Sequence, residues 1–141
     1  MNPLNKTLLI LILLLFCFWG NAQVSISYYS SSISKTGVAY DFNDRLWGEL
    51  RIYGNTFLHE ITPELVFCYN TTTKETHQVY AGLGLNVNIF TGVVLPVGLQ
   101  FSPTQKWYRF SLHIEFQPTF DFGHGRTIIQ SSWGLRYKLI K

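Results

Sequence analysis

The segment that decides the fold is Trp107-Tyr108-Arg109-Phe110-Ser111-Leu112-His113-Ile114-Glu115-Phe116-Gln117-Pro118. From residue 108 to residue 117, every even position is apolar and every odd position is polar. Successive side chains of a β-strand point to opposite faces, so this pattern predicts a strand with one apolar and one polar face. A tilted strand needs roughly 9–11 residues to cross the hydrocarbon core of a bilayer. The segment is long enough for that.

The same alternation recurs along the chain, with polar, glycine or proline residues between the alternating segments. It predicts eight strands, at residues 24–30, 37–43, 45–54, 60–70, 77–88, 93–102, 108–117 and 127–139. Short alternating segments in an even number are typical of an all-β, antiparallel up-and-down barrel. Residues 30–34 are either a turn or the continuation of one bent strand. Residues 71–74 are predicted to be a turn, and residues 119–126 a longer irregular connection.

Prolines fall inside two of the predicted strands, at Pro63 and Pro96. A proline cannot donate a backbone hydrogen bond to a neighbouring strand, so regular central strands exclude it. We therefore expect a bulge or a local kink at each of these positions.

The first 22 residues have the pattern of a cleaved signal peptide. Lys6 precedes an apolar run over residues 8–19, and Gly20-Asn21-Ala22 follows as a peptidase site. The run is shorter than the roughly 20 residues of a spanning helix. Phe16 stands before Cys17 where a lipoprotein signal has a small residue. We therefore expect a signal peptide at residues 1–22 and one domain at residues 23–141, in which the single thiol, Cys68, is inert.

The composition points to a surface that does not face water alone. Charged residues make up 13% of the chain and aromatic residues 16%, whereas about 25% charged residues is typical. The net charge is only +3, and no run of like charges occurs. This distribution predicts no nucleic-acid partner.

Alternation alone does not say which face of the barrel is apolar. A soluble carrier barrel has its apolar face inside, and a membrane barrel has it outside. Here the polar face carries charges of both signs, which suits cross-strand ion pairs in a narrow lumen, and small residues such as Gly82, Gly98 and Ser111. We therefore predict an outward apolar face and a polar network in the lumen, formed by Glu49, Arg51, Glu64, Arg109, His113, Glu115 and Arg136.

The C-terminal strand carries a family resemblance. Its alternating residues Trp133, Leu135, Tyr137 and Leu139 resemble the C-terminal insertion signal of small outer-membrane β-barrel proteins of Gram-negative bacteria. Asn21-Ala22-Gln23 resembles signal junctions common in the Bacteroidetes group. The chain departs from the family in its last residues, because Leu139-Ile140-Lys141 replaces the usual terminal aromatic residue.

The resemblance implies a monomer in the outer membrane. Its partners would be membrane lipid and, during insertion, the barrel-assembly machinery. Both termini would lie in the periplasm, with the loops around residues 31–35, 55–58, 89–92 and 119–126 facing outward. The turns near 43–44, 71–74 and 103–106 would face the periplasm.

Ser111, His113 and Glu115 share one face of one strand and suggest a catalytic triad. Alternate residues of a strand lie ~6.8 Å apart, too far for the roughly 2.6–3.2 Å contacts between a nucleophile and its base. The His-x-Ser-Asn run that precedes the site of small-barrel lipid A deacylases is also missing. We expect no catalytic residues, and we expect His113 to be a hydrogen-bonded residue of the lumen.

The remaining candidate sites are weaker. His124, near Asp121, could share a metal ion with His59, but a metal site needs three or four convergent ligands. Gly82-x-Gly84 is not followed by a helix, so it is not a nucleotide-binding loop. No metal ion and no cofactor is predicted.

Three functions remain open. The first is a non-enzymatic outer-membrane barrel that is structural or binds a partner through its short outer loops. The second is a soluble periplasmic barrel that binds an apolar ligand, and the third is an envelope lipid-modifying enzyme. An eight-stranded barrel is just wide enough for its own side chains, so an open diffusion pore is not expected.

Overall fold

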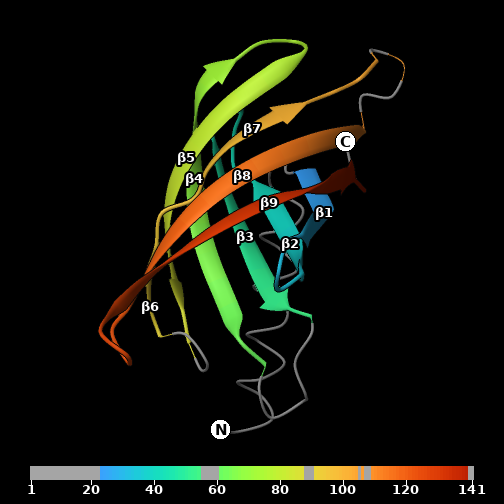
Figure 1. The fold of residues 1–141 in the computed structure, drawn as a ribbon. Helices are drawn as coiled ribbons and strands as arrows, with labels where there is room; N and C mark the ends of the chain where they lie inside the picture. The colour runs from blue at the N-terminus through green and yellow to red at the C-terminus, as the bar shows by residue number, and fades with distance from the viewer. Residues whose placement is uncertain (1–22, 55–60, 88–90, 105, 107–108, 140–141) are drawn as a thin grey trace, which may run out of the picture.

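The strands form one closed antiparallel barrel (Figure 1). A computed structural model describes residues 23–54, 61–87, 91–104, 106 and 109–139. The strands in this part of the chain are β1 (Gln23–Ser30), β2 (Lys35–Asp41), β3 (Leu46–Tyr53), β4 (Pro63–Thr73), β5 (His77–Asn86), β6 (Gly92–Val94), β7 (Val97–Phe101), β8 (Phe110–Asp121) and β9 (Arg126–Lys138). From β1 to β5 each strand pairs with the next, β6 and β7 both pair with β5 and with β8, and β8 pairs with β9. β9 pairs with β1 to close the ring.

β6 and β7 together form one strand of the wall, because both lie between β5 and β8. The barrel therefore has eight wall strands, and the predicted all-β antiparallel barrel is confirmed. The predicted signal peptide lies outside the described residues. No helix in the described ranges is long and apolar enough to cross a membrane.

The structure decides one strand boundary that the sequence left open and changes another. β1 and β2 pair from Gln23↔Asp41 to Tyr29↔Lys35, so residues 31–34 are a turn rather than part of one bent strand. β4 continues to Thr73, so most of the predicted turn at residues 71–74 is strand. Threonine is β-branched and favours strands, and Thr72 and Thr73 pair with β5 after a register shift.

The prediction that the strand ends at Pro118 is wrong. β8 continues to Asp121 and β9 begins at Arg126, so a short turn replaces the expected irregular connection over residues 119–126. In this register Pro118 points its ring nitrogen toward the interruption between β6 and β7, and its carbonyl accepts a hydrogen bond from Leu95 N at 3.0 Å. A proline is tolerated inside a strand where no ladder bond is required.

The other two prolines lie where a strand begins or is interrupted. Pro96 lies between β6 and β7, as the expected local kink, and its carbonyl accepts a hydrogen bond from Gly82 N at 2.8 Å. Pro63 is the first residue of β4, so it needs no bulge.

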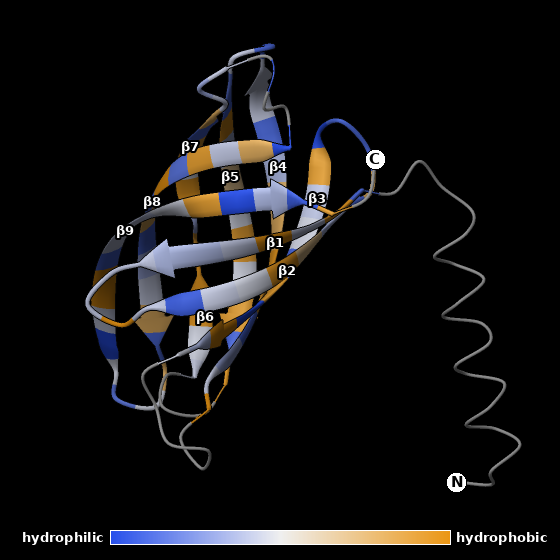
Figure 2. Ribbon diagram, turned by 90° about the vertical axis from the view of Figure 1, so that its right-hand side faces the viewer, coloured by the Kyte–Doolittle hydropathy of each residue, from blue (hydrophilic) through white to orange (hydrophobic). Residues whose placement is uncertain are grey.

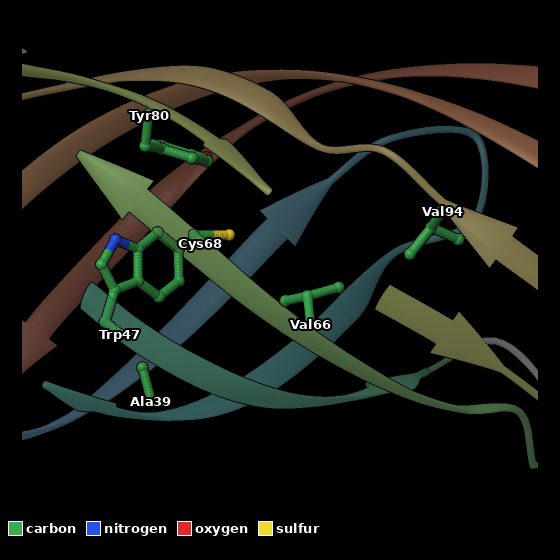
Figure 3. Packing of buried hydrophobic residues seen from close by; sticks show 6 residues of the cluster. All are labelled: Ala39, Trp47, Val66, Cys68, Tyr80 and Val94. Carbon is green, nitrogen blue, oxygen red and sulfur yellow. The ribbon is translucent and has the colours of Figure 1, made fainter. Parts of the chain in front are cut away.

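The apolar face of the barrel is its outer face. Figure 2 shows orange and blue residues alternating along the strands. Ile114 is 57% exposed, whereas its neighbour Glu115 is 1% exposed. The predicted orientation of the wall is therefore confirmed. The interior contains one small apolar cluster, seen from close by in Figure 3, which consists of Ala39, Trp47, Val66, Cys68, Tyr80 and Val94.

Candidate functional site

The lumen contains a connected network of charged side chains, each at most 4% exposed. Its cations are Lys35, Arg51 and Arg136, and its carboxylates are Glu49, Glu64 and Glu115. They come from β2, β3, β4, β8 and β9, that is, from strands on different sides of the barrel. The three positive and three negative groups balance, which is how buried charges are tolerated.

Arg51 is the centre of this network. Its Nη1 and Nη2 donate to the two carboxylate oxygens of Glu115 at 2.7 and 2.8 Å, which is a bidentate pair between β3 and β8. Its Nε donates to Glu49 at 2.8 Å, and Nη1 also donates to Glu64 at 3.3 Å. A planar guanidinium presents several donors in fixed directions, so one arginine can contact all three carboxylates.

Arg136 extends the network toward one end of the barrel. Its Nη2 donates to Glu49 at 3.3 Å, and its Nη1 donates to Gln100 at 3.0 Å. Its guanidinium lies 4.1 Å from the ring centroid of Trp47, a distance suited to a cation–π contact. The hydroxyls of Ser27 and Tyr29 also donate to Glu49.

Lys35 belongs to the network, although the family resemblance implied an outer loop at residues 31–35. Its Nζ donates to Gln117 at 2.6 Å and lies 3.5 Å from Glu64 and 3.6 Å from Glu115. The sequence does contain a signal for this position. Lys35 has the same parity as residues 37 and 39 of the polar face, and β2 begins two residues earlier than predicted.

Tyrosine and glutamine residues complete the network, and none of them is among the predicted lumen residues. Tyr53 donates its hydroxyl to Glu64 at 2.8 Å, and Tyr80 donates to Glu115 at 2.6 Å. Gln117 both accepts from Lys35 and donates to Glu64, at 3.0 Å. Because these side chains point inward from positions of the polar face, their parity was the available signal.

Glycine creates the space for two members of the network. A Cβ atom on Gly37 would lie 2.6 Å from Oε1 of Glu49, and one on Gly98 would collide with the ring of Tyr80. A side chain at either position would require Glu49 or Tyr80 to shift, so the glycines let these large polar side chains occupy a narrow lumen.

Five of the seven predicted lumen residues meet in this network: Glu49, Arg51, Glu64, Glu115 and Arg136. Arg109 does not, because it precedes β8 and its side chain is exposed at the end of the barrel. His113 is 1% exposed, but neither ring nitrogen has a hydrogen-bond partner, contrary to the expectation. Its ring packs 4.2 Å from the ring of Tyr29 instead.

The suggested triad does not form. Ser111 accepts a hydrogen bond from Gln100 at 2.9 Å, and Glu115 is bound to Arg51 and Tyr80. No hydrogen bond joins any two of Ser111, His113 and Glu115 in the structure, so these residues contain no paired nucleophile and base.

The histidine of the β8–β9 turn makes a local hydrogen bond. His124 Nδ1 lies 2.8 Å from Oδ2 of Asp121, and His59 lies outside the described residues. Over the described ranges, no group of three or more His, Cys, Asp or Glu residues could hold a metal ion.

The predicted insertion residues lie on the outer surface. Trp133, Leu135 and Tyr137 of β9 are 62%, 38% and 42% exposed, and Leu139 just after β9 is 46% exposed. This strand is also the one that closes the barrel, through its pairing with β1. A role in insertion stays a prediction.

The lumen is hollow at the end where β1 begins and β9 ends. Two polar cavities of about 510 and 520 Å³ lie there and share Gln78, Gln100 and Lys138. One of them is lined by Arg136. The charge network therefore lies at the inner end of an open, water-accessible vestibule.

Comparisons with known proteins agree with this architecture. No protein-family model matches the sequence, and no curated protein matches it. The crystal structure of the N-terminal β-barrel domain of Pseudomonas aeruginosa OprF is similar, with a TM-score of 0.61 and 13% identity, over 84% of this chain and 96% of that one. A de novo designed transmembrane β-barrel matches with the same TM-score and identity, over 84% of this chain and 94% of that one. The chain therefore has the eight-stranded fold of transmembrane β-barrels.

Proposed function

We propose that this chain is an integral outer-membrane β-barrel protein without enzymatic activity. In this proposal residues 1–22 direct export and are removed, and residues 23–141 insert into the outer membrane of a Gram-negative bacterium of the Bacteroidetes type. The barrel is a monomer that stabilises the envelope or binds a partner through its outer loops. The observation that carries the proposal is the combination of an apolar outer wall with a charge-balanced interior.

The outer wall supports a lipid environment. Large apolar side chains such as Leu85 and Leu83, 60% and 57% exposed, point away from the barrel. Apolar surface left in water costs roughly 25 cal/mol per Å² relative to burial, and this surface extends around the whole barrel. A lipid bilayer removes this cost, because it takes the apolar side chains out of water. A closed barrel is one of the two structures that can span a bilayer, because its wall strands pair their backbone groups with one another.

The interior supports a structural role rather than transport. Arg51 and its carboxylate partners connect β3 with β8 across the lumen, so diffusion of solutes would require these ion pairs to separate. The vestibule lies at the end where β1 begins and β9 ends, and in the family topology this end faces the periplasm.

The two alternative functions fit the geometry less well. A carrier of apolar ligands needs an apolar interior, but the interior positions here hold ion pairs, glutamines and tyrosine hydroxyls. A lipid-modifying enzyme needs its reactive groups on the lipid side, whereas Ser111 and Glu115 point into the lumen.

Fractionation of cells that express the full chain tests the proposal. We expect the processed protein in the outer-membrane fraction after a urea wash, and we expect it to migrate differently on gels before and after boiling. Recovery in the soluble periplasmic fraction would overturn the proposal. Two matched variants of β8 test the orientation of the wall. Ile114→Asp, on the outer wall, should insert less well than Ser111→Asp, which places the same charge in the lumen next to the vestibule.

A further inference from the structure

Near the β8–β9 turn, one side of β9 has no partner among the strands that the structure describes. β8 and β9 pair along their whole length, from Phe110↔Tyr137 to Asp121↔Arg126. The other neighbour, β1, pairs with β9 only from Lys138 to Trp133, where β1 ends at Ser30. Over residues 126–132, no described strand pairs with the second edge of β9. The β8–β9 hairpin therefore extends beyond β1 with an open edge.

The direction of the backbone groups along this edge follows from the hydrogen bonds at its other end. Lys138 N donates to the Arg109 carbonyl next to β8, and Leu139 N donates to the Val24 carbonyl next to β1. In an antiparallel ladder, alternate residues point their N–H and C=O groups to opposite neighbours. The register shows no bulge between these residues and the turn. The N–H and C=O groups of Thr127, Ile129 and Ser131 therefore point to the open edge.

The surroundings of the edge are exposed and present a cation. Ile129 is 63% exposed, and Thr127 and Ser131 are exposed on either side of it. Arg126, at the start of the edge, has a side chain that is 57% exposed, and its partner Asp121 is buried beneath the turn. Asp121 also accepts a hydrogen bond from the backbone N–H of Gly123 at 3.0 Å. The exposed member of this ion pair is thus the Arg126 guanidinium, next to the edge.

We propose that this edge, residues Thr127–Ser131 of β9, binds an extended acidic polypeptide segment of another protein as an additional strand. Donors and acceptors that alternate at strand spacing are complemented by another polypeptide backbone, and the Arg126 guanidinium favours a carboxylate near one end of that segment. An unpaired strand edge is an established template for such pairing. The open edge follows from the strand pairing of the barrel alone. Its exposure at the cell surface rests on the proposed function.

A second copy of this chain in the same membrane does not fit the edge. Antiparallel pairing of β9 with itself requires a two-fold axis perpendicular to the strand. That operation would turn one barrel upside down relative to the other, and barrels inserted by one route share one orientation. Self-pairing through this edge is therefore possible only between molecules outside a common membrane.

Amide hydrogen exchange of the full chain, folded in detergent micelles, tests the proposal with a defined probe. The probe is an acetylated, amidated peptide of sequence Thr-Val-Glu-Val-Glu-Val-Thr. Without peptide, the amides of Thr127, Ile129 and Ser131 should exchange rapidly, whereas those of the intervening residues 128 and 130, bonded to β8, should exchange slowly. Saturating peptide should slow the three edge amides by about tenfold or more, as pairing protects exposed strand amides.

Two controls separate edge pairing from other binding. The same peptide N-methylated at every residue should lose the effect, because it has no N–H donor on either of its edges. Ile129→Pro removes an N–H that faces the open edge and leaves the bonds to β8, so it should abolish peptide protection, whereas Ile129→Val should keep it. Arg126→Gln should weaken binding of the acidic peptide and leave binding of its Gln-for-Glu counterpart unchanged.

Three results would overturn the proposal. The first is slow exchange of the Ile129 amide without peptide at every protein concentration, since the edge would then be covered already. The second is protection that grows with protein concentration alone, which would indicate self-pairing. The third is unchanged exchange at millimolar peptide. A barrel that fractionates with the outer membrane but shows any of these results would refute only this inference and not the proposed function.

Discussion

Replacement of Arg51 by methionine should destabilise the barrel more than any other single substitution in the lumen. Methionine has a similar length but leaves Glu49, Glu64 and Glu115 without the donor that they share. The network then has two cations, Lys35 and Arg136, against three buried carboxylates. Removal of one partner from a buried ion pair costs roughly 3–5 kcal/mol, and we expect an effect of that size.

Urea unfolding of the barrel from lipid vesicles measures this free energy. The fluorescence of Trp47, which lies in the lumen next to Arg136, reports on the interior, and gel migration before boiling reports on barrel closure. The free energy should fall without a large change in the slope against urea concentration, because the surface exposed on unfolding stays similar.

A second substitution separates charge imbalance from loss of packing. Arg51→Met combined with Glu115→Gln restores two cations and two carboxylates, and the amide oxygen introduced by the second change can still accept a hydrogen bond from Tyr80. The double variant should therefore be more stable than Arg51→Met alone, by about 1–3 kcal/mol, in line with the cost of an unpaired buried charge. A double variant that is less stable than the single one, or an Arg51→Met loss below about 1 kcal/mol, would refute the view that Arg51 balances these carboxylates.

Three further substitutions test other parts of the barrel by the same unfolding measurement. Gly98→Val places a side chain against the ring of Tyr80 and should cost about 1–3 kcal/mol; an unchanged stability would mean that Tyr80 can move aside freely. Ile114→Lys puts a charge on the outer wall and should cost about 2–4 kcal/mol in vesicles. As its control, Glu75→Lys in the β4–β5 turn should change stability by less than ~0.5 kcal/mol, and equal costs for these two variants would contradict a lipid-facing wall. His113→Phe should leave the stability within about 1 kcal/mol, since the histidine ring makes no hydrogen bond that the mutation could remove. A loss well beyond that value would reveal a bond to His113 that the structure does not contain.

The faces of the strands could be predicted from the sequence because they depend on a local period. Whether Ile114 points outward and Glu115 inward follows from the residues next to them. The same alternation places Lys35 in the lumen once the predicted strand at residues 37–43 is extended to begin at residue 35, as β2 does. The local sequence pattern therefore determines, for most wall residues, whether the side chain faces outward or into the lumen.

The partners in the lumen could not be predicted, because they depend on how distant strands are staggered. Arg51 and Glu115 belong to strands on opposite sides of the barrel, and no feature near either residue specifies the other. The end of β8 was missed for a related reason. A proline normally ends a strand, but Pro118 faces the interruption at Pro96 on the neighbouring strand, so its effect is visible only after the two strands are aligned.

The contrast between wall and lumen has a consequence for how such a sequence can change over time. An outer position such as Leu83 needs only to be apolar, so many replacements there are interchangeable. A lumen position such as Glu115 is tied to particular partners, so a change of its charge is tolerated only with a second, compensating change across the barrel. We expect related sequences to drift almost freely on the outside and to change in correlated pairs on the inside.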